Sequence, residues 1–420
     1  MSDYDLVIIG AGAAGIGAAK RAAASGLTYK LIEASHRIGG RAYTEPLGPS
    51  RHPFDLGCHW LHSASLNPLV GIADKLGFTY EKQFPKWRIA YGDGEWGGAE
   101  DIDSWNAYDN AAFESIAAAV AAGREGAVAD FTPREDRWTP AWDYVFSLIS
   151  SHDPDQVSAV DNEAYNQTDE DWAVREGYGA LVERFGADVP VTLNTRASVV
   201  DWSGEGVRVE TPTGVLSART AIVTVSTGVL AAGDILFKPG LPAEKLDAVH
   251  QLPLGCHNRI GLAIEPGAFP DEEMGGLSVL CADDADDVPM NLRIRPFGHD
   301  YIVGVTGGRH GDWLERAGQA ASIDLAKEKL RNAFGSRIDR CVTGAIVTAW
   351  RGDPWVKGAY SAATPGNAGA RAVLKEPVAD RLFFAGEATH ASFYSTCHGA
   401  YMSGLDAVDA AAHTMGSAVV

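Results

Sequence analysis

The stretch Tyr4-Asp-Leu-Val-Ile-Ile-Gly10-Ala-Gly12-Ala-Ala-Gly15 decides the fold of this chain. Residues 4–9 are apolar enough for a short buried strand, and an alanine-rich segment that predicts a helix follows the glycines as far as Ser25-Gly26. A second apolar run then ends at Glu33. A strand, a glycine turn, a helix and a second strand with an acidic end are typical of the ADP-binding half of a dinucleotide site.

Each residue of this motif has its own task in that interpretation. Gly10 and Gly12 let the backbone turn tightly and approach a pyrophosphate, and Gly15 lets helix and strand pack closely. The helix N-terminus offers free N–H groups to phosphate, and Glu33 is placed to accept hydrogen bonds from ribose hydroxyls. An ordinary glycine turn is the alternative, but the acid 18 residues beyond Gly15 favours the dinucleotide site.

The composition is that of an ordinary globular protein, with 46% hydrophobic and 21% charged residues in 420, long enough for two domains. A net charge of −20 argues against nucleic acid and anionic membranes as partners. The negative charge would favour the approach of a cationic substrate, but a need for solubility explains the same charge equally well. The five scattered cysteines have neither metal-ligand nor redox spacing. A strand is expected from residue 4, and no apolar run is long enough to span a membrane, so we expect a cytoplasmic protein. We also expect that the protein binds no metal and is a monomer or a homodimer.

A second glycine loop follows directly, in Glu33-Ala-Ser-His-Arg37-Ile-Gly39-Gly40-Arg41. Gly39 and Gly40 permit close backbone approach, and Arg41 offers a fork of donors to phosphate, although an arginine in a surface turn is the alternative. A nicotinamide site does not need this loop. The segment resembles the E-A-x-x-R-x-G-G-R run of FAD-dependent amine oxidases, and the resemblance implies that the dinucleotide is FAD.

The end of the chain resembles the same family. Arg381-Leu-Phe-Phe-Ala-Gly386-Glu387-Ala-Thr389-His390 predicts a buried strand that ends in a Gly-Glu turn, and a helix is expected from His398 to about His413. The resemblance implies that this strand returns to the N-terminal sheet and that Glu387, after Gly386, binds the ribityl chain. The helix N-terminus would face the pyrimidine end of the flavin and stabilise negative charge there.

Asp55-Leu-Gly57-Cys-His-Trp60-Leu-His62 resembles the D-L-G-x-x-W-x-H segment of polyamine oxidases. The resemblance places Gly57 and Trp60 at the cofactor and His62 beside both substrate and flavin, as a catalytic and substrate-binding residue. An imidazole suits hydrogen bonding to an amine or modest proton transfer. A packed loop histidine is the alternative.

The segment Phe393-Tyr394-Ser-Thr396-Cys397-His-Gly399-Ala400 closely resembles the Y/F-Y/F-S-T-x-x-G-A run of polyamine oxidases. The resemblance implies that Thr396 faces the flavin near the substrate and that the Cys397 N–H binds the flavin ring. For Tyr394, both lining of the substrate entrance and core packing remain open.

Trp350-Arg-Gly-Asp-Pro-Trp355-Val-Lys-Gly-Ala359-Tyr360-Ser resembles the family's W-x-x-D-x-x-x-x-G-x-Y-S stretch. This implies Trp350 at the cofactor, and Trp355 and Tyr360 at the substrate, with Tyr360 as one wall of an aromatic slot that attracts cations. Ala359 stands where monoamine oxidases have the cysteine that binds FAD covalently, so we expect non-covalent FAD. Thr396 in place of the opposite aromatic favours a longer aliphatic amine.

One motif departs from the family. Leu252-Pro-Leu-Gly-Cys-His-Asn258-Arg259-Ile260 resembles L-P-x-G-x-x-N-K-I, but the family's lysine, which holds a water against the flavin N5 atom and assists flavin re-oxidation, is Arg259 here. Arginine keeps the charge but differs in shape and does not act as a base. Arg259 is therefore expected in a catalytic position, and the electron acceptor stays open between oxygen and another molecule.

Between these motifs the two parts of the chain are interleaved. Helices are predicted at residues 105–122, 179–185 and 322–334, hairpin strands over 191–222, and further strands at 221–226, 259–264, 301–305 and 344–350. The resemblance implies a Rossmann-type FAD-binding domain from residues 1–70, 190–235 and 372–420, and a substrate-binding domain from residues 71–189 and 236–371. We therefore expect an α/β fold with an α+β substrate part and the active site between the two.

The activity implied by the resemblance is oxidation of an amine, above all a polyamine or acetylated polyamine. Hydride would pass to the flavin, the imine would give an aldehyde and a shorter amine, and oxygen would become hydrogen peroxide. Glu163 and the acids at 169–171 are candidates to bind distal ammonium groups, unless they form a solvated face.

Other functions remain open at this point. An L-amino-acid oxidase needs an arginine for the substrate carboxylate, for which Arg259 and Arg351 are candidates. A monoamine oxidase, a desaturase and a flavin-containing scaffold resembling a chromatin demethylase are the further alternatives.

Overall fold

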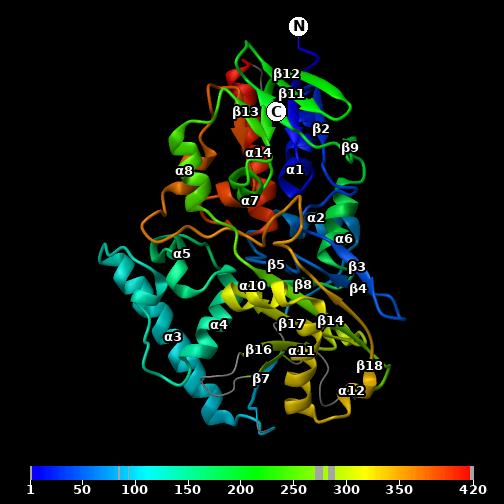
Figure 1. The fold of residues 1–420 in the computed structure, drawn as a ribbon, viewed down its shortest axis with the longest axis vertical. Coiled ribbons are helices and arrows are strands. Elements are labelled where there is room, and N and C mark those ends of the chain that lie inside the picture. The colour runs from blue at the N-terminus through cyan, green and yellow to red at the C-terminus, as the bar shows by residue number, and fades with distance from the viewer. Residues whose placement is uncertain (1, 84–85, 93, 270–277, 282–288, 417–420) are drawn as a thin grey trace.

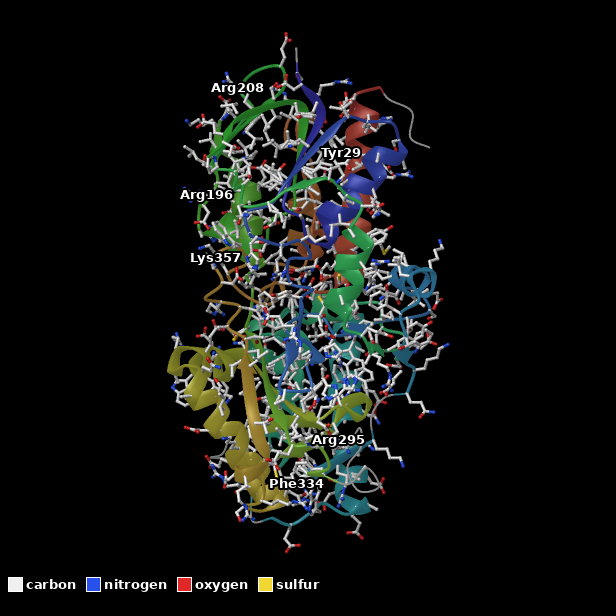
Figure 2. All side chains as sticks on the ribbon, turned by 90° about the vertical axis from the view of Figure 1, so that its right-hand side faces the viewer. Tyr29, Arg196, Arg208, Arg295, Phe334 and Lys357 are labelled. Atoms are coloured by element: carbon white, nitrogen blue, oxygen red, sulfur yellow. The ribbon has the colours of Figure 1, made fainter. Side chains whose placement is uncertain are left out.

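The computed structural model describes residues 2–83, 86–92, 94–269, 278–281 and 289–416. Two large sheets lie at opposite ends of an elongated molecule, and helices pack on both (Figure 1). The side-chain view has Tyr29 and Arg208 toward one end and Arg295 and Phe334 toward the other (Figure 2). No helix in the described part of the chain combines the length and apolarity needed to cross a bilayer.

The first sheet contains the N-terminal glycine motif and has eight strands within the described residues. Seven follow the order β13-β10-β11-β12-β1-β2-β9, and β19 pairs with the second half of β12. The strands are β1 (Tyr4–Ile9), β2 (Tyr29–Ile32), β9 (Val191–Thr192), β10 (Val199–Asp201), β11 (Val207–Thr211), β12 (Gly214–Val223), β13 (Leu236–Lys238) and β19 (Leu382–Phe384). Both β1 and β19 run parallel to the second half of β12, one on each side of it. The N-terminal strand and the strand at Leu382–Phe384 therefore belong to one sheet.

Helices α1 (Ala13–Ala24) and α14 (Cys397–Thr414) pack against each other beside this sheet. The contact depends on small residues, because a Cβ added to Gly404 would lie 2.1 Å from the Ala14 carbonyl oxygen. Leu6 and Ile8 of β1 are fully buried in the same cluster. Elsewhere on this part of the molecule lie α7 (Thr227–Ala231), α8 (Ala243–Gln251) and α13 (Ala370–Lys375).

The second sheet has the order β18-β14-β17-β16-β15-β7 and is antiparallel except between β15 and β7. Its strands are β7 (Trp87–Ala90), β14 (His257–Ile264), β15 (Ser278–Cys281), β16 (Met290–Ile294), β17 (Tyr301–Gly307) and β18 (Val342–Val347). Helices α10 (Gly308–Ala317), α11 (Gln319–Phe334) and α12 (Ile338–Cys341) accompany it. Ile260 and Leu262 of β14 pack with Leu314 and Leu330 of these helices, so the alternate residues of β14 face the other way.

The remaining elements connect the two sheets. They are α2 (Pro68–Leu76), α3 (Ala99–Ala121), α4 (Thr139–Ser150), α5 (Ala159–Glu163), α6 (Tyr178–Gly186), the pair β3 (Thr44–Leu47) with β4 (His52–Asp55), and the trio β5 (Trp60–Leu61), β8 (Trp172–Val174) and β6 (Tyr80–Glu81). Short 3-10 turns lie at Val128–Asp130, Pro154–Gln156, Pro296–Gly298 and Glu387–Thr389. The Tyr144 hydroxyl of α4 donates to the Val305 carbonyl at 2.6 Å, which fixes α4 to the second sheet.

The expected α/β fold with a mixed-sheet substrate part is confirmed. Two local expectations were wrong. Val191–Thr192 belongs to no hairpin but runs parallel to β2 as β9, and residues 221–226 form no separate strand because Ala221–Val223 completes β12. The first half of β12 is largely exposed and its second half is buried, so one strand shows two hydrophobic patterns. The division of the chain into two discontinuous domains stays a prediction.

Candidate active site

A cavity of about 1520 Å³ lies between the two sheets and is lined by both. Its lining includes Gly12 and Glu33 from the first sheet's side and His257 and Arg259 from β14. Typical small-molecule pockets hold roughly 300–1,000 Å³, so this one has room for a dinucleotide and a second ligand. Of the catalytic, cofactor-binding and substrate-binding residues that the motifs predict, all but Gly15 line it. Two of the further candidates, Glu170 and Arg351, do not.

The three motif glycines differ in what surrounds them. Gly10 has φ +105°, and an added Cβ would lie 2.6 Å from the Thr224 hydroxyl oxygen. At Gly15 an added Cβ would lie 1.8 Å from the Gly10 carbonyl oxygen, so Gly15 permits the turn and helix to pack. At Gly12 an added Cβ would meet no protein atom within 4 Å, which leaves this backbone open to a ligand. This cradle fits a pyrophosphate at the N-terminus of α1.

Glu33 is held rigidly at the end of β2. Its carboxylate accepts the Ala11 N–H at 2.7 Å and the Ser35 N–H at 2.8 Å. A carboxylate has about four acceptor positions, so two of them stay available on the cavity side for ribose hydroxyls.

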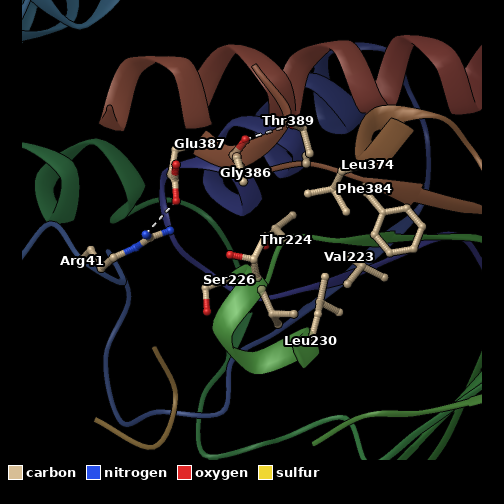
Figure 3. Close-up of a pocket in the computed structure, with 14 residues that line it drawn as sticks. Arg41, Val223, Thr224, Ser226, Leu230, Leu374, Phe384, Gly386, Glu387 and Thr389 are labelled. Carbon is tan, nitrogen blue, oxygen red and sulfur yellow. Dashed lines mark hydrogen bonds and ion pairs between the residues drawn. The ribbon is translucent and has the colours of Figure 1, made fainter. Parts of the chain in front are cut away.

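Arg41 reaches the Glu387 turn rather than standing alone in its loop (Figure 3). Its Nη1 lies 2.9 Å from Glu387 Oε1 and also donates to the Ala359 carbonyl. Burial alone would raise the pKa of Glu387, but Arg41 and Arg371 hold that pKa below its usual value. Part of the Arg41 fork therefore orients Glu387, which the sequence did not indicate. The small pocket behind this turn, of about 20 Å³, has room for a water molecule.

A buried network extends from Glu387 to α5. Ser361 donates its hydroxyl to Glu387 Oε2 at 2.7 Å and accepts from Arg371 Nη1 at 3.0 Å. Arg371 forms two parallel bonds with Asp161, from Nε at 2.7 Å and from Nη2 at 2.8 Å, and both side chains are at most 3% exposed. Tyr394 packs its ring 3.7 Å from the Arg371 guanidinium carbon and donates to the Asp161 carbonyl at 2.6 Å. Tyr394 is thus both a packed residue and a cavity residue.

His62 and Asp171 are brought together by the pairing of β5 with β8. Leu61 lies opposite Trp172, so the residues just outside this pair are neighbours. His62 Nδ1 lies 2.9 Å from Asp171 Oδ1. Burial would raise the pKa of Asp171, but its bond with His62 keeps that pKa below the usual value. An ionised carboxylate on Nδ1 favours the tautomer in which His62 Nε2 is an acceptor.

Tyr360 is fixed in place by both neighbouring elements. Its hydroxyl donates to the Leu148 carbonyl of α4 and lies 3.0 Å from His257 Nδ1 of β14. Burial and the neighbouring Arg259 cation lower the pKa of His257 to about 4, so this imidazole is neutral at pH 7. The phenol ring is therefore a rigid wall of the cavity.

Gly57 lies close to the Trp350 ring, where a larger side chain would not fit. An added Cβ on Gly57 would lie 1.9 Å from the Arg41 carbonyl oxygen and 3.2 Å from the Trp350 ring. The Trp350 indole N–H donates to the Leu56 carbonyl at 3.0 Å. Trp355 lies at the rim, 42% exposed.

Thr396 is the N-cap of α14. Its hydroxyl accepts the Gly399 N–H at 3.0 Å and donates to the Phe393 carbonyl at 2.7 Å. Cys397 begins the helix, and N–H groups in a first turn have no intrahelical partner. This helix end therefore offers positive potential and free donors to the cavity, as a flavin ring requires.

Arg259 lies on the cavity side of β14 and is 7% exposed. Within the described residues its Nε has no hydrogen-bond partner, and its guanidinium carbon lies 5.4 Å from the centre of the Phe54 ring. Glu163 and Asp169, two of the candidate acids, also line the cavity.

Six further residues that were not expected from the sequence complete this site: Asp161, Ser361, Arg371, His59, His257 and Arg293. Asp161 and Arg371 are separated by 210 positions, and no local pattern connects them. Of the six residues, only Arg293 could have been suspected from the sequence, because its charge interrupts an apolar strand.

The dinucleotide cradle, the Glu387 turn and the α14 N-terminus meet at one cavity, which defines a flavin-dependent oxidoreductase. The family described as flavin containing amine oxidoreductase matches residues 145–412, and an NAD(P)-binding Rossmann-like domain matches residues 8–76. The first match alone covers more than half of the chain. The chain belongs to the flavin containing amine oxidoreductase family, and its cofactor is FAD.

The chain is similar to curated proteins named polyamine oxidases and to others named histone demethylases. Polyamine oxidase 4 of Oryza sativa subsp. japonica is 26% identical over 97% of this chain and 88% of its own length. Polyamine oxidase 2 of Arabidopsis thaliana is 26% identical over 96% and 87%. Lysine-specific histone demethylase 1 homolog 1 of Oryza sativa subsp. japonica is 27% identical over 95% of this chain but only 51% of its own length.

Proposed function

We propose that this chain oxidises an amine of the polyamine or acetylated polyamine class, with O2 as the electron acceptor. The observation that carries the proposal is a single cavity with the dinucleotide cradle at one side and the His62–Asp171 pair and Tyr360 at another. FAD, when bound without a covalent link, supplies the acceptor for the hydride of the substrate's α-carbon.

The protein's own residues orient the substrate. His62, with its Nδ1 against Asp171, presents Nε2 as an acceptor for an amine N–H and as a site that can hold a proton. Tyr360 offers its ring face to the amine, and Glu163 and Asp169 offer carboxylates to distal ammonium groups. The α14 N-terminus stabilises negative charge that develops on the cofactor ring.

We also propose a location, an oligomeric state and the kinds of partner for this protein. The protein is expected in the cytoplasm, as a monomer or homodimer, with neither nucleic acid nor membrane as partner. The relatives named demethylases are as similar as those named polyamine oxidases, so a methylated lysine side chain is the second candidate amine.

The test is anaerobic mixing of the holoenzyme with spermine, spermidine, their acetylated forms, putrescine, benzylamine, L-amino acids and a methyl-lysine peptide, with flavin absorbance followed near its ~450 nm band. We expect bleaching by a polyamine, then recovery with release of peroxide when air is admitted. Bleaching without recovery would remove O2 as acceptor, and no bleaching by any amine would refute the function.

Arg259→Lys is expected to speed flavin re-oxidation by O2 on the order of 10-fold, because a compact ammonium is a better proton donor than a guanidinium that never deprotonates. The measurement is stopped-flow mixing of pre-reduced enzyme with oxygenated buffer. Arg351→Lys is the matched control, since Arg351 is 44% exposed and pairs with Asp312 at 2.5 Å. An unchanged rate in Arg259→Lys would show that position 259 does not govern the oxygen step.

A further inference from the structure

Two cysteines that are far apart in the sequence meet at the wall of the cavity. Cys58 lies in the loop between β4 and β5, and Cys397 is the first residue of α14. Both line the cavity, and Cys58 packs against the buried cluster that contains Cys397. Their thiols lie within hydrogen-bonding reach of each other. Both cysteines are free, so the structure holds a pair of thiols beside the cofactor site.

The two thiols differ in exposure and in acidity. Cys58 is partly exposed, whereas Cys397 is buried. The hydrogen bond with Cys397 lowers the pKa of Cys58 although burial opposes it, and the Arg41 cation lowers that pKa further. The same bond and burial raise the pKa of Cys397. Cys58 is therefore the more readily ionised sulfur, and the thiolate is the nucleophilic form of cysteine.

The other cysteines whose side chains the structure describes lack this setting. Cys256 is buried, and burial together with the nearby Glu315 raises its pKa to about 12. Cys341 lies in α12 outside the cavity, where its Sγ is 3.1 Å from the Arg337 carbonyl oxygen. Access from a cavity, a lowered pKa and a second thiol within reach are the features of redox-sensing cysteines. Among the described cysteines, only the pair at the cavity combines them.

We propose that Cys58 and Cys397 form a peroxide-sensitive site, in which a disulfide closes between them and slows the enzyme until a thiol reduces it. Peroxide in the cavity reaches the partly exposed Cys58 before the buried Cys397. The site goes beyond the proposed function and rests on it only for a source of peroxide inside the cavity.

The chemistry needs hydrogen peroxide as its oxidant. The Cys58 thiolate attacks one peroxide oxygen, so that an S–O bond forms, the O–O bond breaks and hydroxide leaves, which takes up the proton that Cys58 had released. The Cys397 sulfur then attacks the Cys58 sulfur, the S–S bond forms, and the hydroxyl group of the sulfenic acid leaves as water with the Cys397 proton. Two thiols are oxidised by two electrons in total, and one peroxide is reduced to two waters. A small dithiol reverses the reaction by exchange.

The disulfide would connect two parts of the site. Cys397 begins the helix whose free N–H groups face the cavity, and Cys58 follows Gly57 in the loop that leads to His62. Bonded sulfur atoms lie closer together than hydrogen-bonded ones, so the loop and the helix end must shift relative to each other. A misplacement on the order of 1 Å in a catalytic site costs about 100-fold in rate. We therefore expect the substrate amine to reduce the flavin of the disulfide form about 10- to 100-fold more slowly.

The first test maps the bond and needs no amine. The holoenzyme is treated with hydrogen peroxide, the remaining thiols are blocked with N-ethylmaleimide, and a digest is searched by mass spectrometry for two peptides linked through Cys58 and Cys397. We expect this linked pair after peroxide and its loss after dithiothreitol. Oxidation of Cys58 to its sulfinic or sulfonic acid without the linked pair, or no oxidation of either cysteine, would overturn the site.

The second test measures anaerobic flavin reduction by an amine before peroxide, after peroxide and after dithiothreitol, with the excess peroxide removed before each measurement. We expect a loss of about 10- to 100-fold after peroxide and recovery with dithiothreitol. In Cys58→Ala the rates before and after peroxide should be equal, and Cys58→Ser gives the same comparison if Cys58→Ala does not fold. Cys341→Ser is the matched control and should lose rate as the unsubstituted protein does, because Cys341 lies outside the cavity. A loss in Cys58→Ala as large as that of the unsubstituted protein would overturn the site.

The outcomes separate this inference from the proposed function. Flavin reduction by an amine that peroxide does not slow, with no linked pair, would overturn the disulfide site and leave amine oxidation intact. A linked pair in a protein whose flavin no amine reduces would support the site and overturn amine oxidation.

Discussion

Gly12→Ala is expected to give a folded protein that binds FAD far more weakly. Gly12 has φ −73° and ψ −173°, which alanine adopts without strain, and an added Cβ would meet no protein atom within 4 Å. The same methyl group would occupy the space where the backbone N–H groups of the α1 N-terminus approach the pyrophosphate. Each phosphate hydrogen bond lost is expected to weaken binding roughly 10- to 100-fold.

The measurement is FAD affinity of the apoprotein by flavin fluorescence, with thermal unfolding of the apoprotein as the test of folding. Gly71→Ala is the matched control, since Gly71 lies in α2 and also has no protein atom within 4 Å of an added Cβ. That control should bind FAD normally and gain up to about 1 kcal/mol of stability. FAD affinity in Gly12→Ala equal to that of Gly71→Ala would show that the pyrophosphate lies elsewhere.

The glycine motif could be predicted from the sequence because its task depends on neighbours in the chain. Gly10, Gly12, Gly15 and Glu33 belong to one strand–helix–strand unit, and its backbone geometry follows from local steric rules. Gly15 differs from Gly12 in a way that the sequence does not show. Its added Cβ would strike the Gly10 carbonyl, so Gly15 serves packing whereas Gly12 faces the ligand.

The rest of the site depends on contacts between distant segments. Arg41 was expected to offer its fork to phosphate, which stays a prediction, and its Nη1 also bonds to Glu387, 346 positions away. His59 meets Arg293 across 234 positions. These pairings are set by how the two sheets approach each other, and neither hydrophobic period nor motif spacing carries that information. The same limit explains why β9 was assigned to a hairpin, since its partner β2 lies more than a hundred residues earlier.

Asp161→Asn is expected to lower the free energy of unfolding by about 3–5 kcal/mol. The network contains two cations, Arg41 and Arg371, and two carboxylates, Asp161 and Glu387, so its charges balance. Asparagine keeps the shape but leaves Arg371 with one carboxylate fewer in a site from which water is excluded. It also weakens the acceptor of the Ala363 N–H, which bonds to Asp161 Oδ2 at 3.0 Å.

Chemical denaturation followed by tryptophan fluorescence measures the effect, and FAD release reports whether the Glu387 turn loosens first. Asp406→Asn is the matched control, because Asp406 forms a 2.8 Å ion pair with Lys375 that is about half exposed on both sides, and such pairs contribute about 0–1 kcal/mol. The double variant with Asp161→Asn and Arg371→Gln should recover part of the loss, since no buried charge is left unpaired. A loss in Asp161→Asn no larger than that of Asp406→Asn would mean that the buried pair does not hold α5 against the cofactor turn.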